Sequence, residues 1–423
     1  MVFQYQFILL TVLAFFSVCN PNKYSMVLVV FMCILPSSLS LTDFNTFNGI
    51  NIFDGVLLGL IVGNIFRAAR FRTVPVYSHD LTYLVILYAV YFLFSLVLGS
   101  DLKFLLKDLR PLLSIITFYL FVRTIVLKND KPLSLSHLLV LVIIIDVFLL
   151  IKYGFHIFYT LQGLDVFYNE NSYRYLDAGV YMSFVVLLYL VFYKRKEASW
   201  WTIGFLVIPI LIANSRIILA ALILATLFFM MYKRRYIDFI KMFFSSFFLV
   251  GVFIIFSLEV GAERISSAFN FEMLLSQIES RYSPAMRVIE GFDWYNYLLG
   301  GGLGIAFDIP WFSYRENVSS FNANIDSYWV TLYCKFGLLV FFVIWCSIKS
   351  LFIFPRAFNA SLAFSILIIF VFSATFYQIY SGGLLCGVYL SWRIGLCAQN
   401  SLYHSKECVQ AASTLLDPKG NSV

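Results

Sequence analysis

Charged residues are scarce in this sequence. Of its 423 residues only 13% are Asp, Glu, Lys or Arg, whereas 61% are hydrophobic, and the mean hydropathy is +0.86. Apolar runs of about 17–22 residues recur from end to end, each about long enough to cross the hydrocarbon core of a bilayer. In lipid every backbone polar group needs a partner within its own segment, and the runs lack the alternation of barrel strands. We therefore expect an all-α, polytopic integral membrane protein.

Motifs that would indicate other chemistry are also missing. The four histidines are scattered without H-x-x-x-H or H-E-x-x-H spacing, and the seven cysteines form no C-x-x-C pair. Neither a metal site nor a disulfide framework is therefore predicted, and we expect no cofactor. No P-loop occurs, and the cytoplasmic loops are too short for a nucleotide-binding domain, which argues against a primary pump. No internal repeat is found, which disfavours a transporter built from related halves.

Hydropathy predicts about 12–14 transmembrane helices. Basic clusters between the runs alternate consistently with the positive-inside rule, so they face the cytoplasm and explain the net charge of +7 without nucleic acid. The N-terminal run lacks a basic n-region and an A-x-A-like site, and we interpret it as a first span. Residues 1–399 then form a single transmembrane domain, and residues 400–423 form a short polar cytoplasmic tail. The expected spans lie at about 5–19, 24–41, 50–66, 81–99, 111–127, 137–153, 178–193, 199–214, 216–232, 239–260, 327–348, 361–379 and 382–398.

The segment 261–326 is the only long polar stretch, and the topology places it outside the membrane. It holds four arginines, no lysine and eight carboxylates. Arginine suits bidentate recognition of phosphate or carboxylate better than lysine does. Ordinary ion pairing with the eight acids is the alternative.

Residues 281–304 of this loop, RYSPAMRVIEGFDWYNYLLGGGLG, predict a short amphipathic helix on the membrane surface. Pro284 suits its first turn, and Arg287 and Glu290 would share one face. The run from Gly300 to Gly304 follows, and its backbone amides could form an anion-binding nest. A helix cap with a tight turn is the alternative.

The next stretch, NANIDSYWVTLYCKFGLLVFF (322–342), enters the following span. Asn324 and Asp326 lie at its mouth. Asp326 is either a carboxylate at the water–lipid boundary that could take a proton from a hydroxyl, or a helix N-cap with Ser327 at the first helical position.

Three further ionisable residues stand in or beside apolar runs. Arg216, in IANSRIILAALILA, separates two of them, and it either binds a ligand at the outer boundary or snorkels to the interface. Asp146 and Lys335 fall within predicted spans. They either pair with each other and hold two helices together, or line a proton path, which would indicate a transporter.

Taken in their order along the chain, several of these motifs resemble those of the bacterial O-antigen polymerases and ligases of the Wzy and WaaL type. The matching pieces are NSYRYLDAG (171–179), Ser215-Arg216, the arginine-bearing loop, Gly300 to Gly304, Asn324 to Ser327, and Gly337-Leu338-Leu339, so that the resemblance covers about residues 170–345. Each motif is weak alone, and the ordered set is more specific. The ligases have a histidine where this chain has Asn-Ile-Asp, and its absence favours a polymerase over a ligase.

The resemblance implies a GT-C-like glycosyltransferase that acts at the periplasmic face of the bacterial inner membrane without a metal. Its substrates would be undecaprenyl-diphosphate-linked glycans, and a chain-length regulator protein would be an expected partner. Arg216 and Arg287 would bind the diphosphate, and Asp326 would be the base, with Glu290 as second choice. Further substrate contacts would come from Arg174, Arg281, Gly302, Gly304 and Asn324. An O-antigen ligase and a lipid-linked-sugar flippase are the alternatives.

Overall fold

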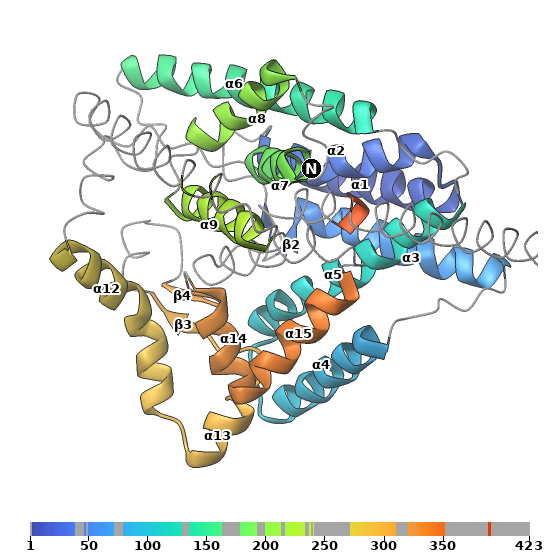
Figure 1. The fold of residues 1–423 in the computed structure, drawn as a ribbon. Coiled ribbons are helices and arrows are strands. Elements are labelled where there is room, and N and C mark those ends of the chain that lie inside the picture. Colours follow the sequence, from blue (N-terminus) through green and yellow to red (C-terminus); the bar gives the residue numbers. More distant parts are fainter. Residues whose placement is uncertain are drawn as a thin grey trace, which may run out of the picture.

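The computed structural model describes residues 2–38, 46–47, 50–71, 79–128, 135–162, 178–192, 199–212, 216–232, 237, 240, 271–309, 320–325, 327–351 and 388–390. Almost all of these residues are helical (Figure 1). The helices of the first half are α1 (Val2–Cys19), α2 (Lys23–Ser38), α3 (Ile52–Phe71), α4 (His79–Val97), α5 (Leu102–Lys128), α6 (Leu135–Leu161), α7 (Ala178–Phe192), α8 (Trp200–Ile212) and α9 (Arg216–Tyr232). Those of the second half are α12 (Phe271–Glu290), α13 (Trp294–Leu299), α14 (Tyr328–Phe336), the 3-10 turn η3 (Gly337–Leu339) and α15 (Val340–Leu351).

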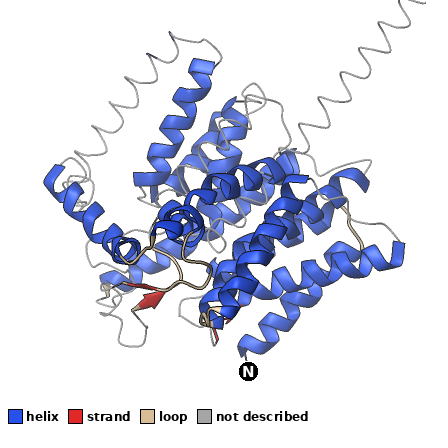
Figure 2. Ribbon diagram, turned by 90° about the horizontal axis from the view of Figure 1, so that it is seen from below, coloured by secondary structure: helices blue, strands red, loops and turns tan. Residues whose placement is uncertain are grey.

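The described strands form two short antiparallel ladders between helices (Figure 2). The first joins β1 (Thr46–Phe47) to β2 (Ile50–Asn51), and the second joins β3 (Phe307–Asp308) to β4 (Phe321–Asn322). Because β3 and β4 lie inside the predicted outer loop, the second ladder gives that loop a fixed base.

Three helices in the described part of the chain are long and apolar enough to cross a membrane: His79–Val97, Ser136–Tyr159 and Tyr328–Ser350. They coincide with the spans expected at about 81–99, 137–153 and 327–348. Shorter apolar helices cover Gln4–Cys19, Gly179–Leu190 and Trp201–Ile212, where three more spans are expected. The chain is therefore mostly helical with membrane-spanning character, which agrees with the coarse prediction.

Of the other predicted spans, some are covered by helices of the structure and others lie largely outside the described residues. Helices α2, α3, α5 and α9 cover four of them. The spans expected at about 239–260, 361–379 and 382–398 lie outside the described residues, apart from residue 240 and residues 388–390. Helix α5 starts at Leu102 rather than at Pro111, and so the proline lies inside the helix.

Helices α1 and α3 pack against each other at unusually close range. Gly55, Gly59 and Gly63 recur every four residues on α3, and a Cβ atom on any of them would press on α1. At Gly55 that atom would lie 2.8 Å from the carbonyl oxygen of Phe7. Small residues with this spacing let transmembrane helices approach closely, where dispersion and not water exclusion drives association.

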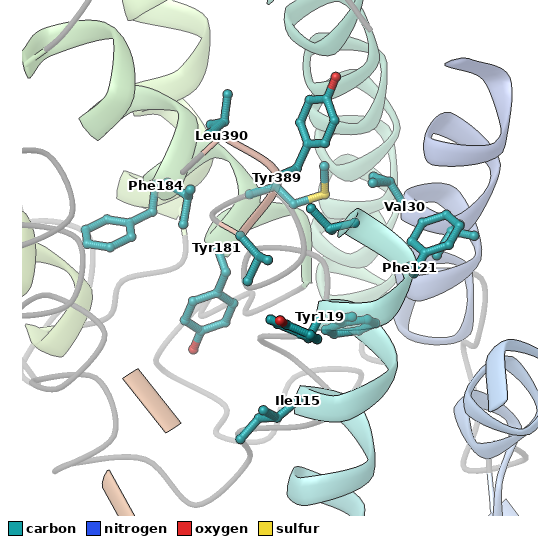
Figure 3. Close-up of a cluster of buried hydrophobic side chains, with 14 of the residues drawn as sticks. Val30, Ile115, Tyr119, Phe121, Tyr181, Phe184, Tyr389 and Leu390 are labelled. Atoms are coloured by element: carbon teal, nitrogen blue, oxygen red, sulfur yellow. The ribbon is translucent and has the colours of Figure 1, made fainter. Parts of the chain in front are cut away.

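The centre of the bundle is aromatic and aliphatic (Figure 3). Helix α7 is buried along residues 179–190, as expected of a helix that is apolar all round. Tyr181 and Phe184 of α7, Tyr119 and Phe121 of α5, and the distant Tyr389 meet there. The C-terminal part of the chain therefore contributes to the same core.

Asp146, on α6, is also part of this core. Both of its carboxylate oxygens accept from the Ser183 hydroxyl on α7, at 2.7 and 2.8 Å. The alternative in which Asp146 and Lys335 pair with each other is therefore wrong. Asp146 joins α6 to α7, whereas Lys335 has another partner.

Helices α4 and α5 are joined by a tight turn that their ends specify. Gly99, with φ 74°, follows α4, and the amides of Gly99 and Ser100 donate to the carbonyls of Leu96 and Ser95 at 3.1 and 3.0 Å. This is a Schellman cap. Asp101 then caps α5, because its Oδ1 accepts from the Lys103 amide at 2.8 Å. The turn places the first turns of α5 beside the last turns of α4.

Candidate functional site

The third candidate span is a broken helix. Helix α14 ends at Phe336, and Gly337 has φ 55° and ψ −138°, which no continuous helix allows. The chain resumes helical form in η3 and α15. The span predicted at about 327–348 is therefore present as Tyr328–Ser350, but it is interrupted at Gly337. Breaks at membrane depth are tolerated where protein or a polar cavity surrounds them, and they often mark binding sites.

The glycine run satisfies the backbone at this break. The Gly301 amide donates to the Cys334 carbonyl at 2.8 Å, and the Gly302 amide donates to the Lys335 carbonyl at 3.1 Å. Gly300 itself caps α13 through the Asn296 carbonyl at 2.7 Å. The predicted helix cap is therefore confirmed at Gly300, whereas Gly301 and Gly302 bind the end of α14.

Only glycine fits where the run and the break meet. Gly300 has φ 76° and ψ −179°, and a Cβ there would overlap the backbone of Lys335. A Cβ on Gly337 would lie 2.6 Å from the Gly300 nitrogen and the Leu298 carbonyl oxygen. The loop and the broken helix therefore touch backbone to backbone.

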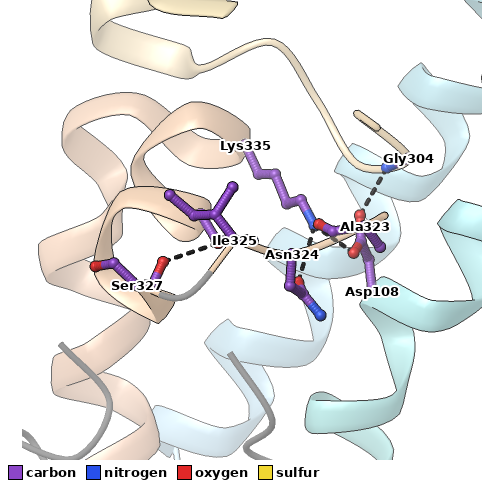
Figure 4. A network of polar contacts seen from close by, with 8 residues as sticks. Asp108, Gly304, Ala323, Asn324, Ile325, Ser327 and Lys335 are labelled. Atoms are coloured by element: carbon purple, nitrogen blue, oxygen red, sulfur yellow. Dashed lines mark hydrogen bonds and ion pairs between the residues drawn. The ribbon is translucent and has the colours of Figure 1, made fainter. Parts of the chain in front are cut away.

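A buried charge pair lies beside this contact (Figure 4). The Lys335 ammonium on α14 forms an ion pair with the Asp108 carboxylate on α5, and both side chains are only 2% exposed. The ammonium also donates to the Ala323 carbonyl at 2.6 Å and to Asn324 Oδ1 at 3.4 Å. The second oxygen of Asp108 accepts from the Gly304 amide at 2.7 Å. We call these five residues the Lys335–Asp108 network.

The network fixes both ends of the segment that carries β3 and β4. Gly304 lies just before β3, whereas Ala323 and Asn324 follow β4. The three acceptors of Lys335 match the three hydrogens of an ammonium group, so that none of its donors is left without a partner in the interior. The anion that the Gly304 amide binds is thus the protein's own carboxylate.

A small cavity with a mixed polar and apolar lining adjoins the network between α4, α5 and α14. The cavity is large enough for roughly one buried water molecule, which would find several polar partners in its lining. Its lining comprises Tyr88, Asp108, Pro111, Leu303, Asn324, Tyr328, Thr331, Leu332, Lys335 and Phe336. Asn324 is the predicted site residue that faces this cavity.

Strand β3 connects the network to the molecular surface. Phe307 is fully buried near the Lys335 ammonium, which lies 5.9 Å from the ring centroid. Its neighbour Asp308 points the other way, as alternation along a strand requires, and lies 4.0 Å from Arg287 of α12. Both partners of this pair are largely exposed, and such pairs are weak. The Arg287 guanidinium therefore lies near β3 with most of its side chain exposed.

Helix α12 carries three of the predicted residues: Arg281, Arg287 and Glu290, all exposed. Its opposite face packs on β3 and α14 through Ala285 and Ile289. The amphipathic character is thus confirmed, but both predicted bounds are wrong. Helix α12 starts at Phe271, well before Pro284, and it ends at Glu290, so that α13 is a separate helix before the glycine run.

The proline fits inside α12 because a hydroxyl replaces its missing amide. Pro284 cannot donate to the Ser280 carbonyl, and the Ser283 hydroxyl does so at 2.9 Å. The α-helix therefore continues past a residue that usually ends one.

The other predicted residues are placed less completely. Arg216 is the first residue of α9, and its side chain lies outside the described part of the structure. Arg174 and Asp326 also lie outside the described residues. The alternative that made Asp326 the N-cap is wrong, because Ser327 caps α14 and accepts from the Val330 amide at 3.4 Å. The structure thus groups Gly302, Gly304 and Asn324 about Lys335, with the α12 residues outside them.

Asp108 is the functional-site residue that sequence reasoning missed. It stands in KDLRP, at the edge of a predicted span, where an acidic residue needs no special explanation. The available signal was Lys335, because a lysine within an apolar run requires an anion from another segment. Nothing in the sequence identified which carboxylate that is.

Residues 24–398 match the model of a protein family whose description is "Family of unknown function (DUF6369)". No curated protein and no solved structure matches the chain significantly. Among the described residues, no group of three or more His, Cys, Asp and Glu side chains could hold a metal ion.

Proposed function

The chain belongs to the DUF6369 family, and we propose that it is an inner-membrane glycosyltransferase that polymerises undecaprenyl-diphosphate-linked repeat units into a surface polysaccharide at the periplasmic face. The observation that carries this proposal is the attachment of α12. An arginine-bearing helix from the one long polar loop is fixed to the membrane domain through β3, the glycine run and a buried charge pair. A loop so held can present cations to a lipid-linked anion at a constant position.

The arginines suit the leaving group of such a reaction. Undecaprenyl diphosphate departs with negative charge, and guanidinium groups fixed where that charge develops lower the barrier. Arg287 is exposed on α12 and lies 4.0 Å from Asp308 of β3. We assign it to the diphosphate, with Arg281 one and two-thirds turns earlier on the same helix as a second contact. Arg216 and Arg174 are further diphosphate or sugar contacts.

The proposed step is an inverting glycosyl transfer. An acceptor hydroxyl of the incoming lipid-linked unit attacks the anomeric carbon of the growing chain's reducing-end sugar. Its proton passes to Asp326, with Glu290 as the second candidate base, and the bond to the diphosphate oxygen breaks with its electron pair. Asn324 would orient the acceptor, since it stands two residues before Asp326 in the sequence and its amide oxygen accepts from the Lys335 ammonium.

Complementation of a strain lacking this gene tests the proposal. Wild type should restore a ladder of surface polysaccharide. Arg216→Ala, Arg287→Ala and Asp326→Ala at matched expression should collapse it to a single capped repeat unit, because each removes a contact worth roughly 10²–10³ in rate. Arg70→Ala, which removes an exposed arginine at the end of α3, is the matched control and should keep the ladder.

The pattern of failure separates the alternatives. If the gene instead decides whether any sugar reaches the lipid core, with no effect on the number of units, the protein is a ligase or a flippase. An unchanged ladder in the Arg287→Ala strain would remove Arg287 from the mechanism.

A further inference from the structure

Helix α13 presents an apolar surface within the loop that the sequence places outside the membrane. Its six residues, WYNYLL, carry no charge. Trp294 is 78% exposed, and Tyr295, Leu298 and Leu299 are each about half exposed. None of the six is buried. Contiguous exposed aromatic and aliphatic side chains of this kind mark an interaction surface.

The depth of α13 follows from its contacts with α4. The Tyr91 hydroxyl donates to the Leu299 carbonyl at 2.5 Å. Tyr91 stands six residues before Val97, the last residue of α4, so this contact lies about 9 Å inside the outer end of that candidate span. Ser95 adjoins Gly302 and Ser100 adjoins Gly304. The glycine run therefore extends from α13 back to the C-terminal end of α4.

The surface of α13 is continuous with surfaces that lipid must cover. The backbone of Leu298 lies against Gly337, and the neighbouring Leu338 and Phe341 are exposed. On α4, Val90 and Phe94 flank Tyr91 and are exposed as well. In a membrane-spanning helix these side chains face acyl chains, because contact with water is unfavourable for apolar surface.

We propose that α13 is inserted into the outer leaflet, with its aromatic side chains at the boundary between acyl chains and headgroups. Helices of this kind bury their apolar face about 5–10 Å below the headgroups, and Trp and Tyr favour that depth. The occupant of the surface is the bilayer lipid. The loop 261–326 is therefore not wholly aqueous. It enters the membrane at α13 and leaves it along the glycine run.

This placement explains the orientation of α12. In Figure 1, α12 lies at one edge of the molecule and crosses the direction of α4 and α15, as a helix on the membrane surface would. Only Gly291 to Asp293 separate it from α13. The exposed α12 arginines are consequently kept near the headgroups, where the diphosphate of a lipid-linked glycan lies. The insertion itself does not depend on the proposed function.

Tryptophan quenching in vesicles tests the insertion. Full-length protein is reconstituted in phosphatidylcholine vesicles whose acyl chains carry bromine either near the carbonyl end or near the chain middle. The protein has seven tryptophans, so the emission of Trp294 is obtained as wild type minus Trp294→Phe. Trp294→Tyr repeats the subtraction should the phenylalanine variant lose its folded elution profile. Trp345→Phe provides the matched control, since Trp345 is 58% exposed on α15.

The expected result is blue-shifted Trp294 emission that loses more than half its intensity to the shallow bromines, less to the deep ones, and little to iodide. Trp345 should be quenched by brominated lipid in the same vesicles. Quenching by iodide alone would place α13 in water and overturn the proposal. Quenching by neither agent would mean that protein covers α13, such as a second copy of the chain, and would overturn it equally.

Discussion

Replacing Lys335 with methionine is expected to lower the free energy of unfolding by about 3–5 kcal/mol, because the Asp108 carboxylate then stays buried without its cation. Asp108→Asn should cost a similar amount, since it leaves the ammonium unpaired. The side-chain volumes change little in either case, so the loss of stability measures the effect of leaving one charge without its partner.

The double variant Asp108→Asn/Lys335→Met should recover most of that stability. No buried charge remains in it, and an amide oxygen can still accept from the Gly304 amide. Unfolding of the four proteins in one detergent gives the coupling energy. Lys349→Met is the matched control, because its pair with Asp80 is 3.9 Å long and exposed, and should cost no more than about 1 kcal/mol. Losses that simply add in the double variant would contradict the account.

Gly300→Ala should be similarly damaging, for a steric reason. The residue occupies a backbone conformation that costs other residues about 1–3 kcal/mol. Its new Cβ would overlap the Lys335 backbone, and relief of such overpacking costs about 1–3 kcal/mol more. The total loss should be about 2–6 kcal/mol, and protease cleavage between α12 and α14 should become faster because the run no longer binds α14.

Gly99→Ala separates the two contributions. Gly99 also has a positive φ, 74°, but nothing lies within 4 Å of its added Cβ. It should lose only about 1–2 kcal/mol and keep wild-type protease resistance. Equal losses at both glycines would mean that backbone conformation alone matters and that the close approach to α14 is unimportant.

Much of the fold was accessible from composition and periodicity. Length and hydropathy predicted the spans that α4 and α6 occupy, because an apolar run of this length is seldom anything other than a membrane-spanning helix. The break at Gly337 was not predicted, since glycine is common in transmembrane helices and carries little positional signal there. The spacing of the α3 glycines indicates close packing, but it does not reveal that α1 is the partner.

The candidate site was predicted only in part. The glycine run and Asn324 were singled out from their order in the chain, and the structure brings them together around Lys335. The partner of Lys335 lies 227 residues away, and no local pattern encodes a contact across that distance. The start of α12 was misplaced because Pro284 normally begins a helix, whereas here the Ser283 hydroxyl lets the helix run through it.

The measurement that tests the central claim most directly is polymerisation by the purified protein. Wild type and Arg287→Ala are reconstituted in vesicles with undecaprenyl-diphosphate-linked repeat units, in the presence of EDTA, and the products are separated by size. We predict a ladder of multiple units and released undecaprenyl diphosphate from wild type, and only single units from Arg287→Ala. Absence of any product longer than one unit with folded wild type, or an equal ladder from Arg287→Ala, would contradict the account.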